Sequence, residues 1–251
     1  YKPVILRTHS PVELHIYDEQ GRHTGEIPIP PEVIAEYDIE EGLYVRYENN
    51  IPGSQFEATG GLDNETTIYL PDDDGKYTIV LKGTGTGTFS FDIDRLMDFV
   101  VDRVRYSNIP VTPLSVATTT LEIPPIVADA ATTSWMVTPL AKSLMVDFDG
   151  NGTDDAAAEP NAELPPTVYL NAIRSTIVAA LGDTNRAKQL LKRVDKIEKN
   201  VMKGKDDKIF AAAMRLFKRT EIVGHKERVG LSEGDKEEII AQIETLVAQF
   251  E

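Results

Sequence analysis

The feature that most constrains the fold of this chain is a change in the spacing of its apolar residues near residue 160. Before that point, short runs alternate apolar and polar residues; Val12, Leu14 and Ile16 fall on one side of such a run. This alternation is typical of a strand with one buried face. From residue 167 onward, apolar residues recur every three or four positions, as in amphipathic helices. The change predicts a β-rich region followed by an α-helical region.

The first region has the pattern of many short strands separated by turn signals. We expect a hairpin turn at residues 18–21, with Gly21 in the left-handed conformation. The glycine-rich residues 83–88 lack the lysine of a phosphate-binding loop and precede a strand-like run, so we interpret them as a bend between strands. The predicted strands include residues 12–17, 22–29, 43–47, 66–70, 76–82, 89–93, 99–106 and 116–123. This succession of short strands and turns predicts an antiparallel, Ig-like β-sandwich over residues 1–142.

The second region contains four helical segments with start and stop signals. Asp183 and Thr184 are suited to cap a helix, and Gly182 and Gly204 are suited to end one. The predicted helices cover residues 167–181, 185–202, 208–222 and 234–250. Short connections between them predict a small up-down helical bundle over residues 161–251.

Between these regions, residues 143–160 are expected to form a calcium-binding loop and linker. Oxygen-bearing residues at alternate positions of a tight loop can wrap a hard cation, and Gly152 permits the sharp turn. The expected ligands are Asp147, Asp149, Asn151, the Thr153 carbonyl and Asp155, the last directly or through water. Position 12 is Ala158 and not the glutamate of an EF-hand, which favours a structural clamp at a domain junction. The alternative is a solvated acidic turn, and residues 72–74 are a candidate for a weak second calcium site.

The nine residues from Asp147 to Asp155 resemble the DxDxNGxxD calcium loops of dockerin-like modules, integrin-type propeller repeats and thrombospondin-type repeats. The resemblance implies a structural Ca²⁺ ion and an extracellular or cell-surface location. Residues 10–18 with Gly21, and residues 75–85, resemble Ig-like accessory sandwiches of secreted bacterial and archaeal proteins. Some of those proteins are hydrolases of the α/β-hydrolase or lipase type.

Other chemistry-bearing residues do not specify a reaction. His15 and His23 flank the predicted hairpin, but zinc sites need three or four ligands, so we interpret them as two solvent-facing imidazoles. His9 and His225 complete the histidines of the chain. No G-x-S-x-G nucleophile elbow is present, and the chain is not expected to be an enzyme.

Charge narrows the choice of partners. The net charge of −15 disfavours nucleic acid and anionic membrane surfaces. The basic residues of the second predicted helix have no aromatic neighbours for base stacking, so we interpret them as a solvated face. No apolar run reaches the length of a membrane span.

These observations favour a non-catalytic, extracellular calcium-binding module that serves surface attachment, assembly or support of an enzyme. Its expected partner is a protein or polysaccharide of the cell surface, or a second copy of the chain through self-assembly. One alternative is a carbohydrate-binding module that uses a row of exposed aromatic side chains. The candidates for that row are Tyr17, Tyr37, Tyr44, Tyr47 and Tyr69. Another alternative is the accessory region of a secreted hydrolase. A further alternative is that the chain is itself a hydrolase, which would require two carboxylates about 5–10 Å apart in a cleft.

Overall fold

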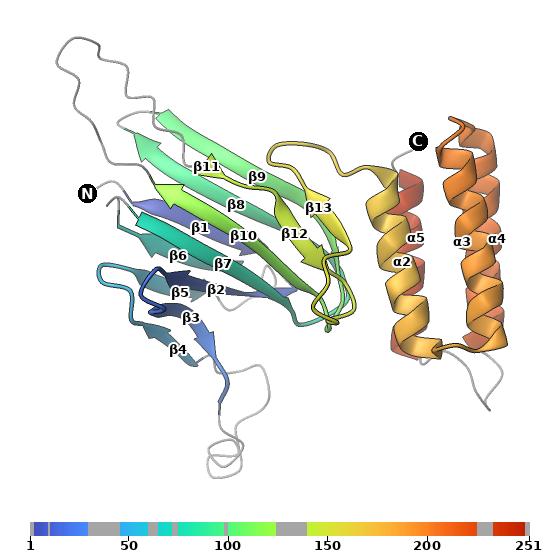
Figure 1. The fold of residues 1–251 in the computed structure, drawn as a ribbon, viewed down its shortest axis with the longest axis horizontal. Helices are drawn as coiled ribbons and strands as arrows, with labels where there is room; N and C mark the ends of the chain where they lie inside the picture. The colour runs from blue at the N-terminus through green and yellow to red at the C-terminus, as the bar shows by residue number, and fades with distance from the viewer. Residues whose placement is uncertain are drawn as a thin grey trace.

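The protein contains two antiparallel sheets and a group of helices at one end of them (Figure 1). The computed structural model describes residues 3–9, 11–29, 46–59, 65–71, 75–97, 100–123, 140–224 and 233–248. Tyr37, Tyr44, His225 and residues 72–74, which the sequence analysis singles out, lie outside these ranges. This architecture confirms a β-rich region followed by an α-helical one, while the Ig-like assignment stays a prediction.

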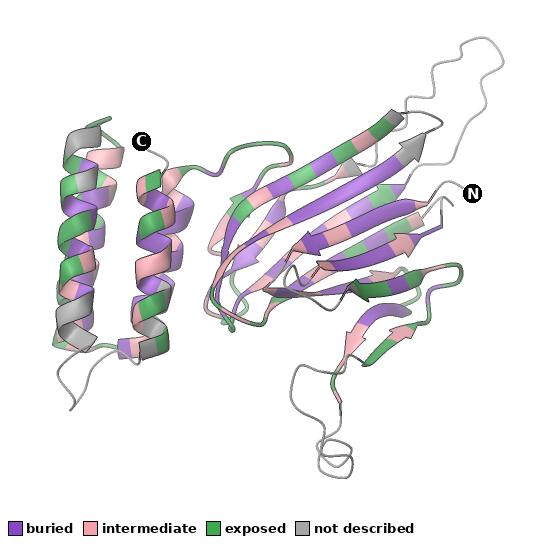
Figure 2. Cartoon of the chain, turned by 180° about the vertical axis from the view of Figure 1, so that it is seen from behind, coloured by how far each residue is buried: buried purple, intermediate pink, exposed green. Residues whose placement is uncertain are grey.

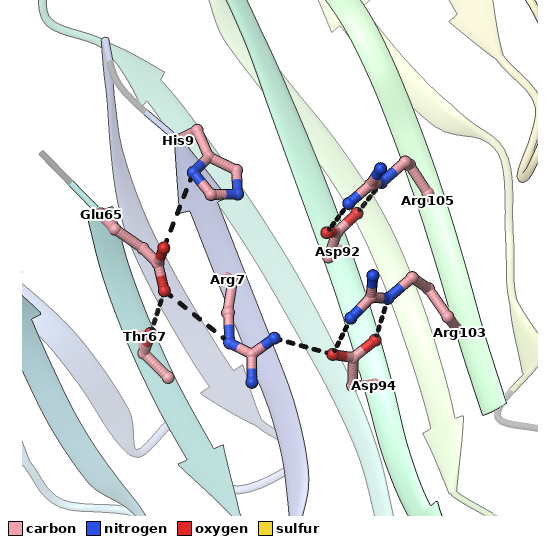
Figure 3. A network of polar contacts seen from close by, with 8 residues as sticks. All are labelled: Arg7, His9, Glu65, Thr67, Asp92, Asp94, Arg103 and Arg105. Atoms are coloured by element: carbon pink, nitrogen blue, oxygen red, sulfur yellow. Dashed lines mark hydrogen bonds and ion pairs between the residues drawn. The ribbon is translucent and has the colours of Figure 1, made fainter. Parts of the chain in front are cut away.

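The first sheet has five strands in the order β5-β6-β1-β8-β9. Its strands are β1 (Val4–His9), β5 (Gln55–Thr59), β6 (Glu65–Leu70), β8 (Gly87–Met97) and β9 (Val100–Val111). Leu6, Ile68 and Phe91 are fully buried on its inner face. The outer face carries a network of ion pairs that joins β1, β6, β8 and β9 (Figure 3). One sheet face therefore packs on the core and the other is polar, as alternation in the sequence predicts.

The second sheet has eight strands, seven of them in the order β13-β12-β10-β7-β2-β3-β4, with β11 paired to β10. Its strands are β2 (Val12–Asp18), β3 (His23–Ile27), β4 (Arg46–Asn49), β7 (Gly75–Gly83), β10 (Val116–Ile123), β11 (Leu140–Ala141), β12 (Leu144–Asp147) and β13 (Ala156–Ala158). Leu14, Ile16, Ile79 and Leu81 are buried together. The predicted hairpin is confirmed: β2 pairs with β3, and Gly21 in its turn has a φ of 74°.

Residues 143–160, predicted as a calcium-binding loop and linker, contain two short paired strands on either side of the acidic segment. Leu144 pairs with Ala158 and Val146 with Ala156, so the acidic segment connects the two strands of a hairpin. The alanines of β13 form an edge strand because β12 offers them an unpaired edge, and Ala158 is buried there. The connection to the helices begins only after β13.

The described helices are α2 (Pro166–Leu181), α3 (Asn185–Val201), α4 (Asp206–Gly224) and α5 (Glu233–Ala248). Each begins and ends within two residues of the predicted bounds. Thr184 caps α3 by accepting a hydrogen bond from the backbone N–H of Ala187, at 3.1 Å. Gly182 ends α2 with a φ of 56°, as predicted.

The helices pack against each other and meet the two sheets at one end. α2 contacts α3 and α5, and α4 contacts α3 and α5. α2 also contacts β9 and β13, and α5 contacts β8. Figure 2 shows buried residues on the helix sides that face one another. Within the described residues, no helix has the length and apolar character needed to cross a membrane.

Candidate metal centre

The acidic segment forms the tip of the β12–β13 hairpin, next to α2 (Figure 1). The backbone N–H of Asp155 donates to the carbonyl of Val146 at 2.8 Å and closes the hairpin below the loop. Asp147 ends β12, and Asp155 directly precedes β13. The two outermost acids of the segment are therefore brought together by strand pairing.

Three carboxylates converge in this loop. Asp147, Asp149 and Asp155 each offer an oxygen, and these atoms all lie within 4.8 Å of one another. Asp147 is 6% exposed, while Asp149 and Asp155 are half-buried. Among the residues that the structure describes, no other group of three acidic, histidine or cysteine side chains converges in this way. Like charges this close repel each other, so the cluster favours a bound cation or a proton.

Backbone N–H groups hold the Asp147 carboxylate in place. Its Oδ1 accepts hydrogen bonds from Gly150 at 2.8 Å and Asn151 at 3.3 Å, and its Oδ2 accepts one from Gly152 at 2.7 Å. The loop backbone is thus wrapped around one carboxylate. Oδ2 accepts only one of these bonds and has a second lone pair, so Asp147 remains able to bind a cation through it.

Two glycines make the tight wrapping possible. Gly150 has a φ of 70° and Gly152 a φ of 83°, a region that other residues rarely adopt. A Cβ atom on Gly150 would lie 2.8 Å from the Leu114 carbonyl oxygen, whereas one on Gly152 would meet nothing within 4 Å. Gly150 therefore serves both the turn and a close approach to the neighbouring chain.

The loop is anchored to the turn between β9 and β10. Phe148 is 1% exposed, and its carbonyl accepts hydrogen bonds from the hydroxyls of Thr112 at 3.1 Å and Ser115 at 3.2 Å. Burial of the Phe148 ring and these two bonds fix the second residue of the loop. The carboxylates on either side of it are positioned as a consequence.

The loop is also bonded to α2. The Asn171 side-chain amide donates to the backbone carbonyl of Asp155 at 3.1 Å. The Asp155 carboxylate accepts hydrogen bonds from the Phe148 N–H, at 2.8 Å, and from Ser175 of α2. A single residue of the loop is thus in contact with the sheet and with the first helix.

The environment of Asp155 raises the pKa of its carboxyl above the usual value. Burial is the largest cause, and the negative charges of Asp149 and Asp147 act in the same direction. The hydrogen bonds from Phe148 and Ser175 oppose the shift. A divalent cation at the cluster would replace this repulsion by attraction.

The structure brings together three of the five expected ligands and places the other two nearby. Asn151 and Thr153 are exposed, and the Asn151 side-chain oxygen accepts a hydrogen bond from the Thr153 N–H at 2.8 Å. Asp154 is exposed and lies outside the group of three. The sequence analysis missed Thr112, Ser115 and Asn171, because nothing local marks residues that reach the loop from distant elements.

The donor set suits a hard cation. The three side chains offer only carboxylate oxygens, and the loop adds amide and carbonyl oxygens, with no nitrogen or sulfur ligand among the expected five. Ca²⁺ takes six to eight oxygen ligands in flexible geometry, whereas Mg²⁺ demands a near-ideal octahedron. The oxygen-only set of residues is therefore of the kind that Ca²⁺ binds.

The histidine pair departs from expectation. His15 and His23 are 4% and 8% exposed, so the interpretation of both as solvent-facing is wrong. Their rings are hydrogen-bonded to each other, and the Tyr17 ring stacks on His23 with centroids 4.7 Å apart. Strand pairing places Tyr17 opposite His23 and brings the two imidazoles onto one face.

The described tyrosines do not form a binding row. Tyr47 is 52% exposed, while Tyr17 and Tyr69 are only partly exposed. Tyr69 lies in the five-stranded sheet and the other two in the eight-stranded sheet. Strand alternation directs Tyr17 and Tyr47 to opposite faces of that sheet. No flat aromatic platform results from these three residues.

No protein-family model matches the chain, and searches of curated proteins and of solved structures find no significant match. The geometry of the loop is therefore the basis for a functional assignment.

Proposed function

We propose that the protein is a non-catalytic calcium-binding accessory module of a secreted or cell-surface protein. The observation that carries this proposal is the convergence of Asp147, Asp149 and Asp155 within 4.8 Å at a hairpin tip. In the proposed site, these carboxylates bind Ca²⁺ together with the Asn151 side chain and the Thr153 carbonyl. The role of the ion is structural, because the site lies at the junction of sheet and helices and no catalytic group accompanies it among the described residues.

The contacts of the loop support a clamp at the junction. Phe148 ties the loop to the β9–β10 turn, and Asn171 and Ser175 tie it to α2. A cation that fixes the three carboxylates also fixes the backbone of Asp155. The carbonyl of Asp155 accepts the hydrogen bond from Asn171 and is fixed with it. Calcium would thereby hold the first helix at a defined position relative to the eight-stranded sheet.

The ligand set also supports a low-affinity site that fills only where the calcium concentration is high. Three carboxylates and no bidentate glutamate at position 12 provide less charge than high-affinity loops carry. We expect a Kd on the order of 10⁻⁴ to 10⁻³ M, the range of extracellular modules. An affinity of this order leaves the site empty in a cytosol and filled outside the cell. Attachment or assembly, through a protein or polysaccharide of the cell surface, is the role that follows.

Thermal melting with calcium and with a chelator tests the proposal. The wild type is expected to melt at a higher temperature in calcium, because the ion binds the folded loop and not the unfolded chain. The double variant Asp147→Asn, Asp149→Asn should lose this shift. Asp154→Asn is the matched control, since Asp154 is an exposed acid of the same loop outside the cluster. A wild type whose melting calcium does not change would overturn the proposal.

A further inference from the structure

A second candidate site lies on β2, β3 and β4, toward one edge of the eight-stranded sheet. The acidic loop joins β12 and β13, at the other edge. His15 Nδ1 and His23 Nε2 face each other at 3.1 Å. Both rings are buried, so their nitrogens are positioned by the fold and not by solvent. The pair brings two strong ligands for transition metals to one point.

The outer nitrogen of each ring contacts a carboxylate. His15 Nε2 lies 3.4 Å from Glu13 Oε2, and His23 Nδ1 lies 2.7 Å from Glu48 Oε1. A histidine that binds a metal almost always donates its other N–H to a carboxylate, a carbonyl or water. The outer nitrogen of each ring therefore contacts a carboxylate, as in histidines that bind a metal through their other nitrogen.

Counting hydrogens shows that two neutral rings do not satisfy this chain of contacts. Three contacts join Glu13, His15, His23 and Glu48, and each needs one hydrogen. Two neutral imidazoles supply only two N–H groups. A cation between the facing nitrogens removes the deficit, because both outer nitrogens then keep a hydrogen for Glu13 and Glu48.

The spacing also fits shared coordination. Two nitrogens bound to one tetrahedral Zn²⁺ at about 2.0–2.1 Å lie about 3.3 Å apart, close to the 3.1 Å between the facing nitrogens. Gly25 leaves room at this point, since a Cβ atom there would lie 2.9 Å from His23 Nε2.

We propose that His15 and His23 bind a divalent transition metal ion of the Zn²⁺, Ni²⁺ or Cu²⁺ class, with Glu13 and Glu48 as positioning residues. Imidazole ligands select these metals over Ca²⁺ and Mg²⁺. Among the described residues, no third acidic, histidine or cysteine side chain joins this pair, so water completes the coordination. The bound ion would link β2 to β3 and, through Glu48, to β4 at the edge of the sheet.

Calorimetric titration of the full chain with ZnCl₂ and with NiCl₂, in saturating calcium, tests the site. Calcium occupies the acidic loop and keeps it from contributing. The wild type is expected to bind one transition metal ion, and His15→Gln and His23→Gln each to lose it. His9→Gln is the matched control, because His9 lies in the other sheet beside Glu65. Glu48→Gln should weaken binding about 10–100-fold while leaving the stoichiometry at one ion.

A measurement on the wild type keeps the test informative if a histidine variant fails to fold. Zinc is expected to shift the imidazole NMR signals of two histidines and leave those of the other two in place. A wild type that binds neither Zn²⁺ nor Ni²⁺ would overturn the proposal. So would a folded His15→Gln variant that binds either ion with unchanged affinity and stoichiometry.

Discussion

At the scale of single residues, alanine substitutions at Gly150 and Gly152 distinguish the cost of backbone strain from the cost of a steric contact. Both have positive φ, so an alanine at either position costs about 1–2 kcal/mol of stability from its left-handed conformation. Only Gly150 also approaches another chain segment, at the Leu114 carbonyl. We expect Gly152→Ala to lose about 1–2 kcal/mol and Gly150→Ala about 2–4 kcal/mol in urea unfolding.

The same two variants report on the loop in calcium. Gly150→Ala displaces the loop from the β9–β10 turn and is expected to weaken calcium binding more than Gly152→Ala does. Isothermal titration of both variants measures this difference. Equal stability losses, with equal calcium affinities, would show that the Leu114 contact has no part in shaping the loop.

Asp94 is the residue whose titration is expected to affect stability at acid pH. It is 2% exposed and accepts two hydrogen bonds from Arg103, at 2.6 and 2.8 Å, and one from Arg7 at 2.9 Å (Figure 3). The Arg103 guanidinium, with a smaller contribution from Arg7, holds the pKa of the Asp94 carboxyl below its usual value. The stability that this lowered pKa contributes is present above the ordinary pKa and is lost as pH falls through the folded-state value.

Urea unfolding of the wild type and Asp94→Asn from pH 7 to pH 2 tests this account. At pH 7 the variant should be less stable by about 1–3 kcal/mol, because a buried charged acceptor is lost and Arg103 loses its carboxylate partner, while Arg7 keeps Glu65. The difference should begin to shrink below about pH 4, where the carboxyl of the unfolded chain becomes protonated, and the rest should be lost as pH falls through the lowered folded-state pKa. A difference that stays constant down to pH 2 would contradict the assignment.

At the scale of elements, local signals in the sequence predict helices better than they predict the edges of sheets. The four helices follow from apolar spacing, Gly182 and the Thr184 cap, all of which act within a few residues. β13 has no such signal: three alanines become a strand only because β12 lies beside them. The burial of His15 and His23 likewise depends on pairing between strands, which spacing along the chain does not show. The loop carboxylates were predictable because ligand spacing is local, but their supports Thr112 and Asn171 were not.

The N-terminus of α3 allows a direct test of one local signal. Thr184→Ala removes the hydrogen bond to the Ala187 N–H and should lower stability by about 1 kcal/mol. Thr184→Ser keeps a capping hydroxyl and is expected to retain most of that stability. Circular dichroism at 222 nm during urea unfolding measures both variants. Equal stability of the alanine and serine variants would mean that the cap contributes nothing.

At the scale of the whole molecule, two of the groups of contacts between the helical region and the sheets can be separated by experiment. One is the acidic loop, through Asn171 and Ser175. The other is Asn161, in the connection between β13 and α2. Its N–H donates to the Arg105 carbonyl at 2.9 Å, and its side-chain oxygen accepts from the Arg105 N–H at 2.8 Å. Calcium is expected to act on the first group and to leave the second unchanged.

Limited proteolysis of the connection separates these two contributions. Glu163 is exposed two residues after Asn161 and is followed by Leu164, so it offers a glutamate-specific protease a cleavage site, whereas Glu159 precedes Pro160 and does not. In the wild type, calcium should slow cleavage there, because a fixed Asp155 holds the start of α2 and suppresses local opening. The double variant Asp147→Asn, Asp149→Asn should be cleaved equally fast in calcium and in chelator, at the rate of the wild type in chelator. Asp154→Asn should behave as the wild type. Asn161→Ala should be cleaved faster with and without calcium, yet still be protected by the ion. Equal cleavage of the wild type in calcium and chelator, at calcium concentrations that fill the loop, would show that the ion does not act on the junction.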